Sequence, residues 1–313
     1  MKSMHQAQPA RLRLVNISTK EFRMAYVTSP PPDRHTRKPR LRLPAGACDT
    51  HFHIFGPQKR FPLDPARRLE VEDCTLDDLI AMHDALGIER GLIVQSFQHG
   101  FAYEYMLHAL LREPNRFRGC IIPAPDITDG ELELLAKSGV VAVRFGFKAS
   151  PVIDARMRAR CHSFGIQPHY LVHGETEIDA WKRDILATEG RFVIEHMGYP
   201  HVEHGLADPC FRFLLECLDT GRCWVKLSPR CSAQPTIPFS DVLPFVTELV
   251  RRAPTRLMWG SDWPHPNYFN PMPNDADLLD LMLEWAPDET VRDAIMTHNP
   301  AELLGFPPAP GRT

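Results

Sequence analysis

Several features that would assign this chain to other classes of protein are missing from its 313 residues. No apolar run approaches the roughly 18 residues that a membrane-spanning helix needs, so we expect a soluble protein without a membrane partner. The eight cysteines include no C-x-x-C pair, and we expect reduced thiols in a cytoplasmic protein. No G-x-G-x-x-G motif follows the first predicted strand, which argues against a dinucleotide-binding fold.

A net positive charge is also missing from most of the chain. The overall charge of -3 argues against a nucleic-acid partner. Residues 1–42 hold ten Lys or Arg and two acidic residues, so they carry +8 while the rest carries -11. Because this segment also contains Pro30 to Pro32 and lacks the apolar core of a secretory signal, we expect residues 1–44 to form a basic, disordered extension. An organellar address is the alternative, and residues 307–313 are expected to be a C-terminal tail.

Residues 45–306 alternate between short β-branched runs and segments with a helical period. The predicted strands cover 47–55, 90–96, 118–124, 140–147, 166–173, 191–197, 222–228 and 256–262. The predicted helices between them cover 76–86, 103–112, 131–137, 154–164, 178–188, 211–218 and 242–251. Eight such alternations favour an α/β fold of the closed (β/α)8 type, a TIM barrel, over an open doubly wound sheet.

Ionisable side chains gather at the predicted C-terminal ends of these strands, where a barrel of this type carries its active site. They are His51, His53, Arg144, His173, His196, Arg230 and Asp262. Ser96 and His99, on the loop after the second strand, are expected to line the same pocket and contact the substrate. Independent burial of so many ionisable groups at matching strand ends would be costly, so we interpret the set as a catalytic site.

Three motifs resemble those of the amidohydrolase superfamily. They are DTHFHIFGP at 49–57, EHMG at 195–198 and MWGSDWPHPN at 258–267, of which the last is the most specific. Within the superfamily the chain resembles the amidohydrolase-related branch that contains 2-pyrone-4,6-dicarboxylate hydrolase, and the resemblance covers about residues 45–306.

The resemblance implies a lactonase of aromatic or sugar-acid catabolism that opens a small anionic lactone, such as a pyrone dicarboxylate or a muconolactone. In this interpretation Asp262 is the general base for water, and His51, His53 and His196 polarise the carbonyl and stabilise the oxyanion. Arg144 and Arg230 match residues that bind substrate carboxylates.

Three positions depart from the pattern of that hydrolase. Leu69 stands in place of a carboxylate-binding tyrosine, and Ser150 stands about where a second strand-four arginine would be. His173 occupies the position of a strand-five tyrosine. These differences put the pyrone dicarboxylate itself in doubt as the substrate.

His173 also leaves the question of a metal open. Other branches of the superfamily hold one divalent ion with residues that match His51, His53, His173 and Asp262, and zinc would suit such a set. In the metal-free alternative, which is that of the pyrone-dicarboxylate hydrolase, His173 donates to the substrate carbonyl. The alternative functions are a mononuclear zinc-dependent decarboxylase of an unsaturated or aromatic carboxylate, and a barrel that binds without turnover. The protein could be a monomer or a homo-oligomer.

Overall fold

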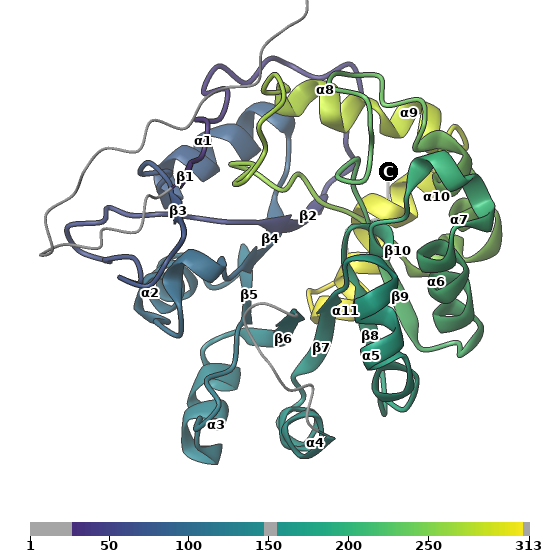
Figure 1. The fold of residues 1–313 in the computed structure, drawn as a ribbon. Helices are drawn as coiled ribbons and strands as arrows, with labels where there is room; N and C mark the ends of the chain where they lie inside the picture. The colour runs from purple at the N-terminus through teal and green to yellow at the C-terminus, as the bar shows by residue number, and fades with distance from the viewer. Residues whose placement is uncertain (1–26, 147–154, 309–313) are drawn as a thin grey trace, which may run out of the picture.

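The computed structural model describes residues 27–146 and 155–308, and Figure 1 shows a ring of strands surrounded by helices. Every neighbouring pair in the eight-stranded sheet is parallel. In order the strands are β2 (Cys48–Phe52), β4 (Arg90–Val94), β5 (Phe117–Ile121), β6 (Val140–Gly146), β7 (Gln167–Leu171), β8 (Phe192–Ile194), β9 (Cys223–Leu227) and β10 (Leu257–Trp259). The expected (β/α)8 barrel is confirmed, and each predicted strand overlaps an observed one.

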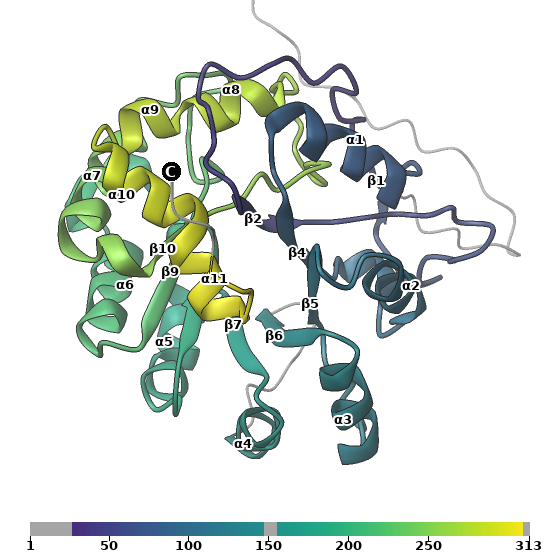
Figure 2. The same ribbon diagram turned by 180° about the vertical axis from the view of Figure 1, so that it is seen from behind.

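Helices form the outer layer, which can be followed from both sides in Figures 1 and 2. Between the barrel strands lie α1 (Leu76–Leu86), α2 (Glu104–Arg112), α3 (Asp129–Lys137), α4 (Ala155–Ser163), α5 (Gly174–Leu186), α6 (Pro209–Asp219) and α7 (Leu243–Arg252). Each overlaps one of the predicted helices. After β10 come α8 (Asp275–Asp280), α9 (Met282–Trp285), α10 (Glu289–Asp293), a π-helical turn (Ala294–His298) and α11 (Asn299–Leu304). These short helices were not predicted, because none is long enough to show a clear helical period.

Local sequence determines where several of the outer helices begin and end. Thr75 and Asp78 form a reciprocal capping box at the start of α1, in which each side chain accepts from the other residue's backbone N–H. Gly87 ends the same helix with φ of 79°, a left-handed conformation that glycine adopts at little cost. Thr128 and Glu131 repeat the capping box at α3.

The inside of the barrel is apolar at one end and polar at the other. The apolar part consists of Cys48, Leu92, Val94, Cys120, Ala142, Val193, Trp224 and Met258, packed against residues of α11. Side chains two positions apart on a strand share a face, so Lys226 points inward like Trp224, and Arg144 points inward like Ala142. The alternation that fills the floor with apolar groups therefore also carries charged groups into the barrel above it.

The ring closes where the ends of β2 and β10 meet. The backbone N–H of Asp262 donates to the carbonyl of His51 at 2.7 Å, and the N–H of His53 donates to the carbonyl of Trp263 at 2.7 Å. Both expected histidines of the first strand and the expected aspartate of the last therefore lie in one hydrogen-bonded junction. Strand closure itself brings these site residues together.

The carboxylate of Asp49 holds this junction from below. One oxygen accepts from the N–H of His51 and the N–H of Ser261, each at 3.0 Å, and the other accepts from the Ser261 hydroxyl at 2.5 Å. His83 on α1 lies 3.3 Å from the second oxygen, and Asp49 is fully buried. A buried carboxylate with this many donors crosslinks the first strand, the last strand and a helix.

A segment before the barrel also follows a defined path. Residues 27–44 run over the barrel, and β1 (Val27–Thr28) pairs in parallel with β3 (Leu69–Glu70). Nε of Arg40 lies 3.0 Å from the carboxylate of Asp280 on α8. We expected disorder here because the composition is basic and rich in proline; ion pairs with acidic groups of the barrel instead hold this stretch.

Residues 1–26 lie outside the described residues, as does Ser150. The predicted domain boundaries at residue 44 and at 307–313 stay predictions. Within the described ranges no helix combines the length and the apolar character needed to cross a membrane. All eight cysteines are free thiols, as expected, and seven are buried.

Close approach of the two closing strands makes a prediction for Gly260. A Cβ atom at this position would lie 2.7 Å from the Cβ of His51 and 3.1 Å from its backbone nitrogen. Gly260→Ala should therefore lower the free energy of unfolding by about 1–3 kcal/mol, measured by urea denaturation. Gly130→Ala on α3, where the same atom meets nothing within 4 Å, is the control and should be neutral or stabilising. Equal effects of the two substitutions would contradict the packing argument.

Candidate active site

A cavity of about 870 Å³ opens at the C-terminal ends of the strands. The predicted site residues in its lining are His53, Ser96, Arg144, His173, His196, Arg230 and Asp262. Arg67 and Arg68, which precede β3, add two further guanidinium groups to the wall. Four arginines around one cavity make it suitable for an anionic ligand.

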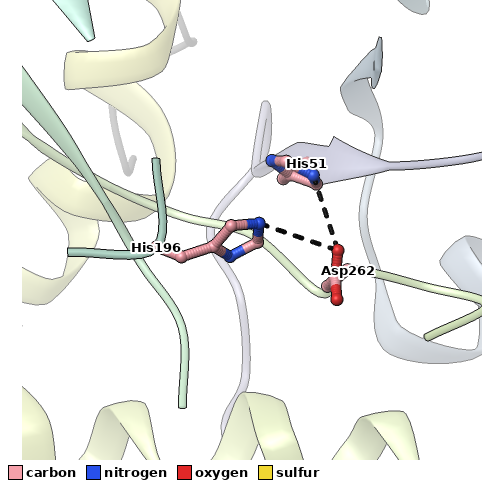
Figure 3. A group of neighbouring side chains, drawn as sticks. All are labelled: His51, His196 and Asp262. Carbon is pink, nitrogen blue, oxygen red and sulfur yellow. Dashed lines mark ion pairs between the residues drawn. The ribbon is translucent and has the colours of Figure 1, made fainter. Parts of the chain in front are cut away.

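His51, His196 and Asp262 form a compact buried group, shown in Figure 3. Oδ1 of Asp262 lies 3.5 Å from Nε2 of His51, 3.9 Å from Nε2 of His196 and 3.6 Å from Nε2 of His53. The first and sixth barrel strands therefore direct three imidazoles at one carboxylate oxygen from the end of the eighth.

The backbone is strained at two of these residues. His196 has φ of 49° within the turn after β8, and Asp262 has φ of 64° after β10. Non-glycine residues rarely adopt this left-handed region, and such residues cluster at functional sites. Here the conformation turns both side chains toward the cavity at the ends of their strands.

Asp262 keeps its negative charge in spite of burial. Burial alone would raise the pKa of its carboxyl group, but Arg230 and the neighbouring histidines outweigh this and hold the pKa well below its usual range. Nε of Arg230 lies 3.0 Å from Oδ2, an ion pair without hydrogen-bond geometry. The second carboxylate oxygen thus faces a cation while the first faces the imidazoles.

The histidines are held through Nδ1 by different partners. Nδ1 of His53 lies 2.7 Å from the carbonyl of Val94, so it must carry the proton, because a carbonyl only accepts. Nδ1 of His196 lies 2.7 Å from the hydroxyl of Ser228. Burial lowers the pKa of His196 to about 3, so this imidazole is neutral near pH 7.

The donor atoms do not fit the expected zinc site. Among the described residues, the group with ligand atoms within 4.8 Å of one another is His51, His196 and Asp262, and neither His53 nor His173 belongs to it. Nδ1 of His51 lies 3.3 Å from the ammonium of Lys226. The three grouped residues could hold a metal ion, but they are not the set that the resemblance implied.

Arg144 is in the cavity wall but is partly engaged by another protein group. Its Nε donates to Oε2 of the fully buried Glu195 at 2.7 Å, and its guanidinium group lies 5.0 Å from the centre of the Phe97 ring. Contact of this arginine with a substrate carboxylate stays a prediction. The structure adds a second role, which is to neutralise a buried carboxylate.

His99 does not lie where we expected it. Its ring is stacked between Phe55 and Tyr105, with centroids 5.3 and 3.8 Å away, and it is absent from the cavity lining. The sequence offered no sign of this stack, because the three aromatic rings come from separate elements. Ser96 does line the cavity, where its hydroxyl donates to Gln98.

His173 lines the outer part of the cavity rather than its centre. Its side chain is 49% exposed, and its ring centroid lies 4.1 Å from that of Tyr199. Its backbone N–H donates to Glu177 at 2.7 Å. A role in substrate contact remains a prediction, whereas the expected grouping with His51 and His53 is not what the structure shows.

Sequence reasoning assigned no role to three buried polar groups, His169, Glu195 and Lys226, or to the half-buried Tyr199. Tyr199 lines the cavity, and burial raises its pKa to about 12. Strand parity was the available signal for the others, because His169 and Lys226 share the inward face with known interior residues.

Comparison with known proteins agrees with the fold and the motifs. The family model described as amidohydrolase matches residues 48–306. The chain therefore belongs to the amidohydrolase family, as the motifs predicted.

Two curated relatives are named as hydrolases. The 4-sulfomuconolactone hydrolase of Rhizobium radiobacter is 36% identical over 272 residues, covering 84% of this chain and 91% of the relative. The 2-pyrone-4,6-dicarboxylate hydrolase of Comamonas testosteroni is 31% identical over 281 residues, covering 85% and 92%. An apo crystal structure from Agrobacterium tumefaciens is 25% identical with a TM-score of 0.74, covering 87% of this chain and all of that one.

Burial of neutral histidines makes a prediction about stability and pH. Burial lowers the pKa of His99 and His196 to about 3 and that of His169 to about 4, whereas an unfolded histidine titrates near 6.5. Below about pH 6.5 the unfolded chain binds protons that the folded chain does not. The free energy of unfolding should fall from there toward pH 4, by up to about 1.4 kcal/mol per pH unit for each group.

Urea denaturation between pH 8 and pH 5 measures this slope. His99→Phe is a matched variant, because it keeps an aromatic ring in the stack and removes one titrating group. In this variant the slope of the free energy of unfolding against pH should decrease by the contribution of one bound proton. A denaturation midpoint that is constant down to pH 5 in the unmodified protein would contradict the prediction.

Proposed function

We propose that this protein hydrolyses a small anionic lactone, with Asp262 as the general base. The observation that carries the proposal is the ionised Asp262 facing three imidazoles in a cavity lined by four arginines. Two relatives that cover most of the chain, named for 4-sulfomuconolactone and 2-pyrone-4,6-dicarboxylate, support this class of substrate.

The reacting water is held between His53 and Asp262. Nδ1 of His53 donates to the carbonyl of Val94, and its Nε2 lies 3.6 Å from Oδ1 of Asp262. A water molecule that donates to Oδ1 of Asp262 is the reactant, and the imidazole of His53 lies beside it. Removal of one of its protons by Asp262 produces the nucleophile.

Attack on the lactone carbonyl forms a C–O bond and leaves an oxyanion. Ring N–H groups of the site histidines stabilise this oxyanion. The ester C–O bond then breaks, the ring opens, and the proton held by Asp262 passes to the departing ring oxygen. His196 and Tyr199 at the cavity wall lie beside this reaction path. The product has one new carboxylate and one new hydroxyl group or its keto tautomer.

The arginines bind the charged substituents of the substrate. Arg230 and Arg144, which pair with the buried Asp262 and Glu195, form the inner pair, and Arg67 and Arg68 precede β3. Arg67 is paired with Glu70 at 2.9 Å, whereas Arg68 is exposed. A substrate with an anionic group close to its lactone carbonyl fits the inner pair.

The zinc-dependent decarboxylase is not favoured. The named relatives above are hydrolases, and the donor set does not match the expected mononuclear site.

Asp262→Asn tests the assignment of the base. The variant should fold and bind ligand, but kcat should fall about 10²- to 10⁴-fold, because an amide cannot accept the proton of water. Acid release measured with a panel of anionic lactones, including the substrates for which the relatives are named, gives the rate. Incorporation of one ¹⁸O atom from labelled water into the new carboxylate confirms hydrolysis. Retention of more than about a tenth of wild-type kcat would show that Asp262 is not the base.

Arg230→Gln tests the charge balance around the base. Loss of the guanidinium should raise KM for the anionic substrate and raise the pKa of Asp262, since Arg230 is the cation that holds this pKa down. The acidic limb of the kcat/KM profile, where the base becomes protonated, should therefore move to higher pH. Arg68→Gln is the control, because it removes a cavity arginine that does not pair with Asp262. A shift of the limb in both variants, or in neither, would contradict the assignment.

A further inference from the structure

Lys226 is an ammonium group sealed inside the barrel below the proposed site. Its side chain is 1% exposed, and β9 directs it inward beside the apolar floor. A buried charge is costly unless it is paired and hydrogen-bonded. Among the described residues, Nζ contacts Oε1 of Glu195 at 3.2 Å and Nδ1 of His51 at 3.3 Å.

Glu195 connects this lysine to the cavity wall. It is fully buried and also accepts from Nε of Arg144 at 2.7 Å. Burial alone would raise its pKa, but Arg144 and Lys226 hold the pKa well below its usual range, so it is ionised. One carboxylate thus lies between two cations, and one of these cations is directed at His51.

The neighbours of His51 determine which nitrogen carries its proton. Nδ1 lies 3.3 Å from the ammonium of Lys226 in hydrogen-bond geometry, and 3.5 Å from Oε1 of Glu195 without it. An ammonium group cannot accept, so Nδ1 must present its lone pair. Nε2, which no described protein group bonds, then carries the proton 3.5 Å from Oδ1 of Asp262.

We propose that Lys226 and Glu195 are positioning residues that hold His51 as the tautomer with its proton on Nε2, facing Asp262. The inference rests on the proposed lactone hydrolysis. An N–H at this position orients the carboxylate of Asp262 and offers a donor to negative charge in the site. The opposite tautomer would place a nitrogen lone pair against the carboxylate.

Lys226→Met is the informative variant. It nearly conserves volume, and it leaves the neutral pair of Arg144 and Glu195, so the interior holds no unpaired carboxylate. Without the ammonium, Glu195 becomes the available partner of Nδ1 of His51. The proton should move to Nδ1, and kcat should fall about 10- to 100-fold with KM changed less than about threefold.

Nitrogen-15 NMR of labelled histidine measures the tautomer directly, and His51→Gln identifies the signals of this ring. Wild type should show a protonated Nε2, and Lys226→Met a protonated Nδ1. Met258→Leu is the matched control, because Met258 pairs with Lys226 in the sheet register and belongs to the apolar floor. It should change neither the tautomer nor kcat.

A protonated Nδ1 in the wild type would overturn the proposal without any variant. So would an unchanged tautomer in Lys226→Met, a similar loss of kcat in Met258→Leu, or zinc found in the purified wild type with His51 among its ligands. A wild type that opens no lactone would refute the proposed function instead, and the NMR result would still decide the tautomer.

Discussion

Closure of the barrel between its first and last strands is the constraint on which the site depends. The N–H of Asp262 bonds the carbonyl of His51, and Asp49 ties both strand ends from below. Gly260 permits the backbones to approach this closely. The geometry of the general base relative to the imidazoles is therefore a property of the closure, and the same hydrogen bonds serve both the fold and the site.

A second constraint is the balance of charge inside the barrel. A low-dielectric interior penalises each charge, so the interior pairs Glu195 with Arg144 and Lys226, and Asp262 with Arg230. These pairs keep the carboxylates ionised, while burial lowers the pKa of His51, His169 and His196 and keeps these rings neutral. Negative charge at Asp262 and a cavity that attracts anions can therefore exist side by side.

Much of the architecture could be predicted from the sequence. The alternation of β-branched runs and helical segments identified all eight barrel strands, and the strand ends identified Asp262, His51, His53 and His196 as neighbours. The short helices after β10 were missed because they are too brief to show a period. The path of residues 27–44 was missed because it depends on ion pairs with distant acidic groups, such as that of Arg40 with Asp280.

The sequence by itself determined which side chains point into the barrel and at which end they lie, because strand parity and the order of the strands are local properties of the chain. Only the tertiary structure decided the partners. Arg144 bonds Glu195, His99 enters an aromatic stack, His173 stays at the outer wall, and Lys226 reaches His51. The reason is that distances of 3 to 4 Å between side chains on different strands depend on the closure and register of the whole ring, which no single segment encodes.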